Sequence, residues 1–202
     1  MSLYDRILGH PFVYHHVRPL VVGIDYTVQY EALDVHSHDR ILDIGCGGGD
    51  ALRYLDTFAA YHGFDTDDVA ISFANQRPEA GRPNVHFETA LVTPATFHKI
   101  RPTLVMMNGL LHHLGDEAAV QLLRMCAATN TVKRIVTNDT VYLPREPLNN
   151  ILAWLDRGRF VRRVQGYRDL VARAGLTIAH EEVVRSHTTR GIALYLVMVL
   201  ER

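Results

Sequence analysis

The sequence predicts an α/β fold, in which a mostly parallel β-sheet carries helices on both faces and ends in an antiparallel C-terminal hairpin. Short apolar runs alternate with helical patterns from residue 40 to residue 137, and this alternation is typical of parallel sheets. The chain has 202 residues, of which 48% are hydrophobic and 21% charged. These values indicate one globular domain with a substantial core and exclude a disordered chain or a coiled coil.

The parallel part of the sheet is expected from five runs of apolar or alternating residues. They lie at residues 40–45, 61–64, 85–89, 103–107 and 133–137. Helices are expected between them at 51–58, where Leu52, Leu55 and Phe58 have helical spacing, and at 69–74 and 116–128. A helix after a strand brings the chain back to the edge of the sheet where the next parallel strand begins.

The two ends of the chain depart from this alternation. Near the C-terminus, helical patterns at 148–156 and 167–174 precede two strand-like runs at 177–184 and 193–200, which we expect to pair as the hairpin. Near the N-terminus, residues 1–38 contain apolar helical patterns at 3–17 and 20–33. This segment is predicted to form a lid over the ligand site, with packing along one sheet edge as the alternative. Residues 39–202 form the core of a single domain, 1–202.

Charge and composition exclude several classes of partner. The 21 Lys and Arg residues balance 22 Asp and Glu, so the net charge is −1, and nucleic-acid or anionic-membrane binding lacks its usual electrostatic basis. The N-terminus has charged residues where a signal peptide needs an apolar run. Cys46 and Cys126 show no zinc-site spacing. We therefore expect a soluble cytoplasmic protein without a membrane segment.

The sharpest motif is a glycine-rich loop at the end of the first expected strand, Ile41-Leu42-Asp43-Ile44-Gly45-Cys46-Gly47-Gly48-Gly49. Glycines allow positive φ angles and let a ligand approach the backbone closely. A dinucleotide fold would have a third glycine where this chain has Asp50, and that carboxylate would repel a pyrophosphate. Asp65 follows Gly45 by twenty residues and could accept hydrogen bonds from ribose hydroxyls. A tight turn and a helix N-cap are the purely structural alternatives.

With these motifs, the sequence resembles the class I S-adenosylmethionine-dependent methyltransferases from about residue 39 to its end. The first motif of that family has the form of the glycine loop here, and its second strand ends in an acidic residue. The segment LVMMNGLLHHL (104–114) is similar to the fourth-strand motif of the family, and residues 156–176 are similar to the segment after strand five in members that act on small molecules. The resemblance implies a Rossmann-like, seven-stranded sheet.

The resemblance also implies which residues bind S-adenosylmethionine. Gly45, Cys46, Gly47 and Gly49 would shape the loop around the methionine moiety, with Asp43 beneath it. The remaining expected cofactor contacts are Asp65 on the ribose, Thr66 along the adenine, backbone groups of Ala90 and Leu91, and Asn108, whose carbonyl would face the methionine ammonium. Thr89-Ala90-Leu91 lacks the acidic residue that many members carry after the third strand, so the backbone would have to recognise the adenine.

Candidate catalytic residues lie after the fourth and fifth expected strands. His113, and next to it His112, could deprotonate a hydroxyl near neutral pH, although a structural role is the alternative for both. Asp139 is a further candidate for contact with the substrate or for capping a helix. Asn138-Asp139 has the residue types of a magnesium site, but no second carboxylate accompanies it, so no metal site is predicted.

These observations predict a transferase that methylates a small-molecule acceptor, at oxygen rather than at nitrogen or carbon. N- or C-methylation and a non-catalytic cofactor-binding subunit are the alternatives. The chain is expected to be a monomer or a homodimer. A basic cluster, Arg157, Arg159, Arg162 and Arg163, would suit an anionic group of the substrate or form a solvated helix face.

Overall fold

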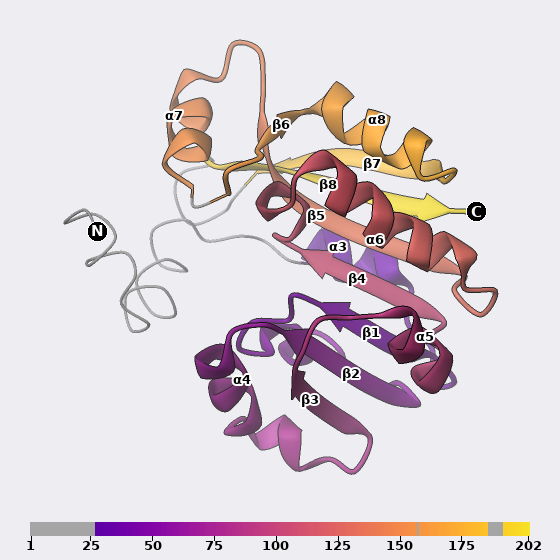
Figure 1. Ribbon diagram of the computed structural model, residues 1–202. Helices are drawn as coiled ribbons and strands as arrows, with labels where there is room; N and C mark the ends of the chain where they lie inside the picture. The colour runs from indigo at the N-terminus through magenta and orange to yellow at the C-terminus, as the bar shows by residue number, and fades with distance from the viewer. Residues whose placement is uncertain (1–26, 157, 186–191) are drawn as a thin grey trace.

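The computed structural model describes residues 27–156, 158–185 and 192–202. Its sheet has the strand order β3-β2-β1-β4-β5-β8-β7, and Figure 1 shows the parallel strands side by side with the two C-terminal strands next to β5. The strands are β1 (Arg40–Ile44), β2 (Ala60–Asp65), β3 (Val85–Thr89), β4 (Leu104–Asn108), β5 (Arg134–Tyr142), β7 (Thr177–Arg185) and β8 (Leu194–Glu201). A two-residue strand, β6 (Arg162–Arg163), pairs with the end of β5.

The strand pairing confirms the predicted fold class. Strands β1 to β5 pair in parallel, whereas β8 is antiparallel to both β5 and β7. The C-terminal hairpin therefore closes the sheet on the β5 side. The strand β5 is longer than expected and runs to Tyr142, since Thr140, Val141 and Tyr142, which favour strands, follow the polar pair at 138–139.

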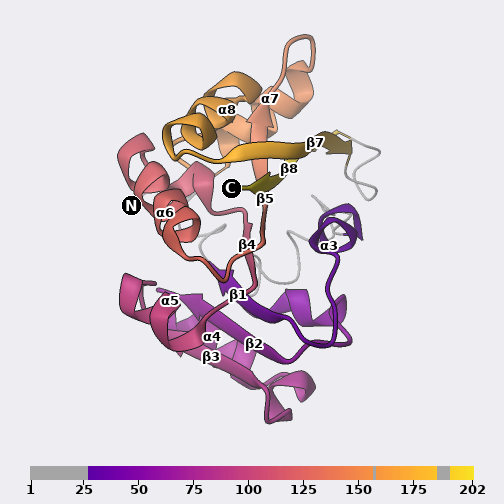
Figure 2. The same cartoon turned by 90° about the vertical axis from the view of Figure 1, so that its right-hand side faces the viewer.

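Helices cover both faces of the sheet. They are α3 (Thr27–Leu33), η2 (Asp50–Arg53), α4 (Asp68–Asn75), η3 (Pro78–Gly81), α5 (Pro94–Ile100), η4 (Leu111–His113), α6 (Asp116–Ala128), α7 (Pro147–Leu155) and α8 (Val164–Arg173), where η marks a 3₁₀ helix. Figure 2 shows α5 and α6 on one side of the sheet and α3 on the other. None of the helices in the described part of the chain has the length and apolar character that crossing a membrane requires.

The alternation of side chains along each strand creates two apolar cores. Leu42 and Val105 point to one face, where they pack with residues of α5, α6 and α8. Their neighbours Ile41 and Leu104 point to the other face, where they pack with residues of α3 and η2. Both faces of the central strands are buried, which explains why these strands are continuous apolar runs in the sequence.

Two local predictions differ from the structure. The expected helix at 51–58 is a single 3₁₀ turn, η2, followed by an irregular segment. Its apolar residues are three positions apart, a spacing that fits a 3₁₀ turn, and Asp56 and Thr57 are poor helix formers. Helix α5 was not predicted individually. It begins at a capping box between Thr93 and Thr96, which a search for apolar periodicity does not detect.

The predicted N-terminal segment is only partly described. Its final turns form α3, which lies against β5 and β8 and buries Gln29, Tyr30 and Leu33. This part of the segment therefore covers a sheet face rather than an edge. The expected helix at 3–17, and with it the prediction that residues 1–26 form a lid, lies outside the described residues.

Candidate functional site

The predicted ligand-binding residues meet at one edge of the sheet. Gly45, Asp65, Ala90 and Asn108 lie at the carboxyl ends of β1, β2, β3 and β4, which are neighbours in the sheet. The carboxyl ends of the strands are where ligands bind in open α/β sheets. The structure thus brings residues that are far apart in the chain together at the edge of the sheet where a ligand crevice is expected.

The glycine loop has the backbone conformation that its composition predicts. Gly45, Gly47 and Gly49 have φ angles of 75°, 52° and 73°, which favour glycine. A Cβ at Gly49 would lie 2.6 Å from Cζ of Phe87, whereas a Cβ at Gly47 would have no neighbour within 4 Å. Gly49 is therefore required for packing, and Gly47 leaves open space beside the backbone.

Asp65 ties the glycine loop to the second strand. Its carboxylate accepts hydrogen bonds from the backbone amides of Gly47 at 2.8 Å and Asp67 at 3.0 Å. The side chain is not an N-cap, because Asp67 caps α4 instead. Each carboxylate oxygen has further acceptor capacity, so the two amides orient Asp65 without preventing it from binding hydroxyl groups.

Asp50 does not present an uncompensated charge to the crevice. Arg77, which follows α4, forms an ion pair with Asp50 and also donates to the carbonyl of Gly48, and Arg53 lies 3.6 Å from the same carboxylate. The argument that Asp50 repels a pyrophosphate is weaker than the sequence suggests, because two guanidinium groups offset its charge. The other argument against a dinucleotide fold still holds, because this position lacks the third glycine of that motif.

Asp43 lies buried beneath the loop. Its Oδ2 atom accepts a 2.5 Å hydrogen bond from the hydroxyl of Tyr61, while Oδ1 has no partner. Burial raises the pKa of this carboxyl group to about 7, although the Tyr61 hydrogen bond acts in the opposite direction. Asp43 is thus a buried acid whose unpaired oxygen is available to a donor.

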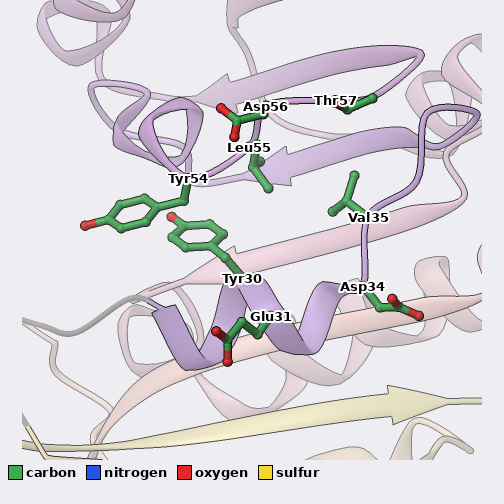
Figure 3. Close-up of a pocket in the computed structure, with 8 residues that line it drawn as sticks. All are labelled: Tyr30, Glu31, Asp34, Val35, Tyr54, Leu55, Asp56 and Thr57. Atoms are coloured by element: carbon green, nitrogen blue, oxygen red, sulfur yellow. The ribbon is translucent and has the colours of Figure 1, made fainter.

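Asn108 connects the crevice to α3. Its side-chain amide donates to the Tyr30 hydroxyl at 3.3 Å, and its Oδ1 atom is buried without a partner. The Tyr30 ring stacks on that of Tyr54, with centroids 4.7 Å apart. Figure 3 shows both rings in a groove between α3 and the segment after η2, a region of about 290 Å³. Sequence analysis did not single out this groove.

The remaining predicted cofactor residues are close to the crevice and are mostly accessible. Thr66 is exposed, Cys46 is half-buried and Leu91 has 75% of its surface exposed. The backbone amide of Ala90 donates to the carbonyl of Asp65 at 2.9 Å. The turn after β3 is therefore held against the end of β2, and the Leu91 side chain projects from it.

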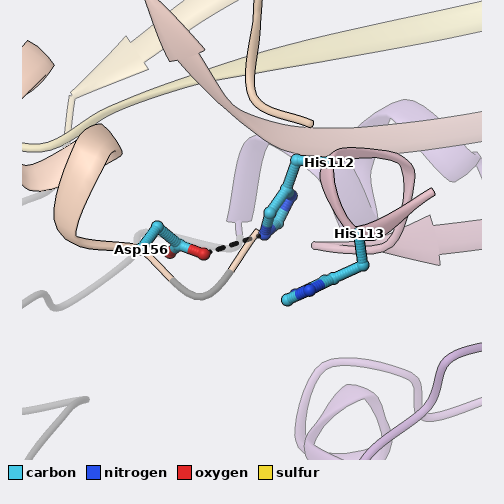
Figure 4. A group of neighbouring side chains, drawn as sticks. All are labelled: His112, His113 and Asp156. Atoms are coloured by element: carbon cyan, nitrogen blue, oxygen red, sulfur yellow. Dashed lines mark ion pairs between the residues drawn. The ribbon is translucent and has the colours of Figure 1, made fainter. Parts of the chain in front are cut away.

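The two candidate histidines have different environments. His112 is buried, its Nδ1 atom lies 2.8 Å from Oδ1 of Asp139, and its Nε2 atom lies 3.3 Å from Oδ1 of Asp156 (Figure 4). Burial alone would lower the pKa of His112, but the two carboxylates raise it to about 9. His113 is exposed, and its ring centroid lies 4.3 Å from that of His112.

Asn138 and Asp139 point to opposite faces of the sheet. Asp139 contacts His112, whereas the amide of Asn138 donates to Gln29 on α3. Both residues lie within β5 rather than at its end, so consecutive side chains alternate between the faces. A magnesium ion shared by these two side chains is excluded by this geometry.

One arginine of the predicted basic cluster, Arg162, connects separate backbone segments by hydrogen bonds. Arg162 donates to the carbonyls of Leu111, Leu114 and Phe160, and forms an ion pair with Asp116. The loop after α7 is thereby fastened to the turn after β4. Arg159 and Arg163 are exposed, and Arg157 lies outside the described residues. Neither of the two predicted roles describes Arg162.

Comparisons with known proteins agree with this geometry. Residues 41–131 match the sequence profile of a methyltransferase domain family. No curated protein is similar enough in sequence to count as a match.

Several solved structures have the same fold. An S-adenosylmethionine-dependent methyltransferase from Mesorhizobium loti has a TM-score of 0.65 at 16% identity, over 89% of this chain and 99% of the other. A cyclopropane synthase from Mycobacterium tuberculosis has a TM-score of 0.69 at 10% identity, over 100% of this chain and 99% of the other. Magnesium protoporphyrin IX methyltransferase from Synechocystis, solved with bound S-adenosylhomocysteine, has a TM-score of 0.61 at 16% identity, over 82% of this chain and 74% of the other. At such identities the likeness establishes the fold.

Proposed function

We propose that this chain, which matches a methyltransferase domain family over residues 41–131 and shares its fold with S-adenosylmethionine-dependent methyltransferases, methylates a small-molecule acceptor at oxygen. When bound, its cofactor S-adenosylmethionine supplies a methyl group on an electrophilic sulfonium centre. The residues at the carboxyl edge of the sheet hold this cofactor and orient the acceptor. Alignment of the two reactants accounts for a large part of the rate of such a displacement.

The residues of the crevice fit this cofactor. Gly47 leaves open space beside the loop, as close approach of a ligand to the backbone requires. Asp65 can accept hydrogen bonds from both ribose hydroxyls. Buried, unpartnered oxygens of Asp43 and Asn108 suit the ammonium group of the methionine moiety, because a buried acceptor without a donor is costly.

The observation that carries O-methylation is the position of His113. Leu110, which precedes η4, contacts the glycine loop, since its Cδ1 atom is 3.1 Å from the position of a Cβ on Gly45. His113 lies on η4 and is exposed. It can accept the proton of an acceptor hydroxyl at a ring nitrogen. His112 cannot do so in this arrangement, because carboxylates face both of its nitrogens.

A second candidate function is supported by helix α7. Leu148, Ile151 and Trp154 have 60%, 54% and 74% of their surfaces exposed, and apolar side chains grouped on one element mark interaction surfaces. This feature favours a cofactor-binding subunit that acts with a partner protein. N- or C-methylation remains the alternative for a catalytic chain.

One assay tests these functions against one another. The protein is incubated with S-adenosylmethionine and separate sets of small hydroxyl compounds, amines and compounds with an acidic carbon, and with bulk transfer RNA. Release of S-adenosylhomocysteine and the mass of the product are measured. Methylation within the hydroxyl set is expected. Products only from amines, carbon acids or RNA would contradict O-methylation, and cofactor binding without any product would favour the non-catalytic subunit.

A further inference from the structure

Two histidines and one aspartate converge beside the crevice. One ring nitrogen of His112, one of His113 and a carboxylate oxygen of Asp156 lie within 4.8 Å of one another, and Figure 4 shows the three side chains turned toward a common space. The histidines lie on η4 and the carboxylate directly after α7. We propose that these three residues bind a divalent metal ion of the zinc type.

The distance between the ligand atoms of buried His112 and half-buried Asp156 fits coordination. Nε2 of His112 and Oδ1 of Asp156 are 3.3 Å apart. Two bonds of about 2.0–2.1 Å at a tetrahedral angle place their donor atoms about 3.3 Å apart. Nε2 is buried and has no partner in good hydrogen-bond geometry, so its lone pair can serve a metal ion.

Asp139 prepares His112 for this role. It accepts hydrogen bonds from Nδ1 of the ring and from the backbone amide of His112, at 2.8 Å and 3.0 Å. Metal-binding histidines usually donate their other ring nitrogen to a carboxylate in this way, which fixes the ring and leaves the second nitrogen for the metal. Gly158 packs closely on the His112 ring, since a Cβ there would be 2.1 Å from Cδ2 of the ring.

His113 supplies the third ligand from the exposed side of the site. Its ring is already next to that of His112, with centroids 4.3 Å apart. Rotation of an exposed side chain closes the remaining distance at small cost. The His112 ring is held by packing against Gly158, and Oδ1 of Asp156 is positioned by a 2.9 Å hydrogen bond from the backbone amide of Gly158. Two imidazoles and one carboxylate favour zinc-like ions over magnesium, and three protein ligands leave a coordination position open for water or an oxygen ligand.

Without a metal, the same arrangement is an imidazolium between two carboxylates. A proton and a metal ion compete for Nε2 of His112, so the two states cannot coexist. The inference does not depend on the proposed function, because it concerns binding of the ion alone. It does affect the role of His113, since a nitrogen bound to a metal cannot accept a proton.

A titration with Co²⁺ tests the proposal. The protein is treated with a chelator, dialysed and titrated with Co²⁺ while its visible absorption is recorded, and Zn²⁺ is then added as a competitor. We expect one ion per chain, with the intense absorption of a four- or five-coordinate Co²⁺ site, and its loss when Zn²⁺ displaces the cobalt. Absorption no stronger than that of free hydrated Co²⁺ would overturn the proposal.

Variants separate this site from binding to other histidines, of which the chain has 12 in all. His113→Gln and Asp156→Asn should each weaken Co²⁺ binding at least about tenfold, and Asp139→Asn about 10- to 100-fold. His98→Gln removes an exposed histidine on α5 and should change nothing. Circular dichroism confirms folding, and His113→Gln keeps the test valid if the buried variants unfold. Equal affinity in His113→Gln and the unmodified protein would exclude the site.

Discussion

The backbone amide of Gly47 donates a 2.8 Å hydrogen bond to the carboxylate of Asp65. This bond joins the middle of the glycine loop to the end of β2, so the residue expected to hold the ribose also fixes the loop that surrounds the methionine moiety. This hydrogen bond therefore connects the two parts of the proposed cofactor site. A change at Asp65 should affect the whole site rather than one hydroxyl group.

Replacement of Asp65 by Ala should weaken binding of S-adenosylhomocysteine by about 1.5–3 kcal/mol, the range for hydrogen bonds to a charged group. Calorimetric titration measures the effect. Asp68→Ala, which removes an exposed carboxylate in the first turn of α4, serves as the control and should bind as the unmodified protein does. Equal dissociation constants for Asp65→Ala and this control would remove Asp65 from the ribose site.

Two glycine substitutions should separate packing from ligand binding. Gly49→Ala should reduce the free energy of unfolding by about 2–4 kcal/mol, because its Cβ would overlap the Phe87 ring at a positive φ. Gly47→Ala meets no protein atom and should cost about 1–2 kcal/mol of backbone strain. Its main effect should be a loss of S-adenosylhomocysteine affinity, of at least about tenfold.

Urea denaturation and calorimetry of the two glycine variants provide the comparison. Should Gly47→Ala bind the ligand normally, the open space beside Gly47 would not be part of the cofactor site. A stability loss in Gly49→Ala no larger than in Gly47→Ala would show that Phe87 yields easily to the added methyl group.

Asp43 should make the protein less stable as the pH rises. Its pKa is raised from 3.8 to about 7 in the folded state, so between these values the unfolded chain releases a proton that the folded chain retains. Stability from this group is complete below pH 3.8 and falls until the pH passes 7. Asp43→Asn removes the effect and should stabilise the ligand-free protein by about 2–4 kcal/mol at pH 8.

Denaturation of both proteins at pH 4 and pH 8 measures this difference. The gain in stability from Asp43→Asn should be much smaller at pH 4, because the side chain at position 43 is then neutral in the folded state of both the unmodified protein and the variant. Tyr61 can still donate to the amide oxygen of the asparagine. An equal gain at the two pH values would mean that the Asp43 carboxyl group has an ordinary pKa.

His113→Gln should lower the turnover of the metal-free protein at least about tenfold with a hydroxyl acceptor, because a general base contributes roughly 10²- to 10⁴-fold. The affinity for S-adenosylhomocysteine should remain the same. His98→Gln is again the control. Full activity of His113→Gln would mean that alignment of the reactants carries the reaction without a base.

The fold could be predicted from the sequence because its signals are local. The expected strand 85–89 and helix 116–128 match β3 and α6 in their bounds, since alternation and helical periodicity are both clear there. The region after the glycine loop misled the prediction, because Leu52, Leu55 and Phe58 are buried equally well by a 3₁₀ turn and an extended segment. Spacing alone does not distinguish these conformations.

The candidate site could be predicted only where its residues follow strand ends. Gly45, Asp65 and Asn108 do so, and the parallel sheet brings them together. The contact of His112 with Asp139 depends on β5 continuing to Tyr142, which decides the face to which Asp139 points. The approach of Asp156 depends on how the loop after α7 packs, and no local pattern in the sequence encodes that packing.

The most direct test of the cofactor site is a calorimetric titration of the unmodified protein with S-adenosylhomocysteine, with NAD⁺ titrated in parallel. The structure predicts saturable binding of one S-adenosylhomocysteine per chain and none of NAD⁺. Absence of saturable S-adenosylhomocysteine binding, together with binding of NAD⁺, would contradict the assignment of the crevice to S-adenosylmethionine.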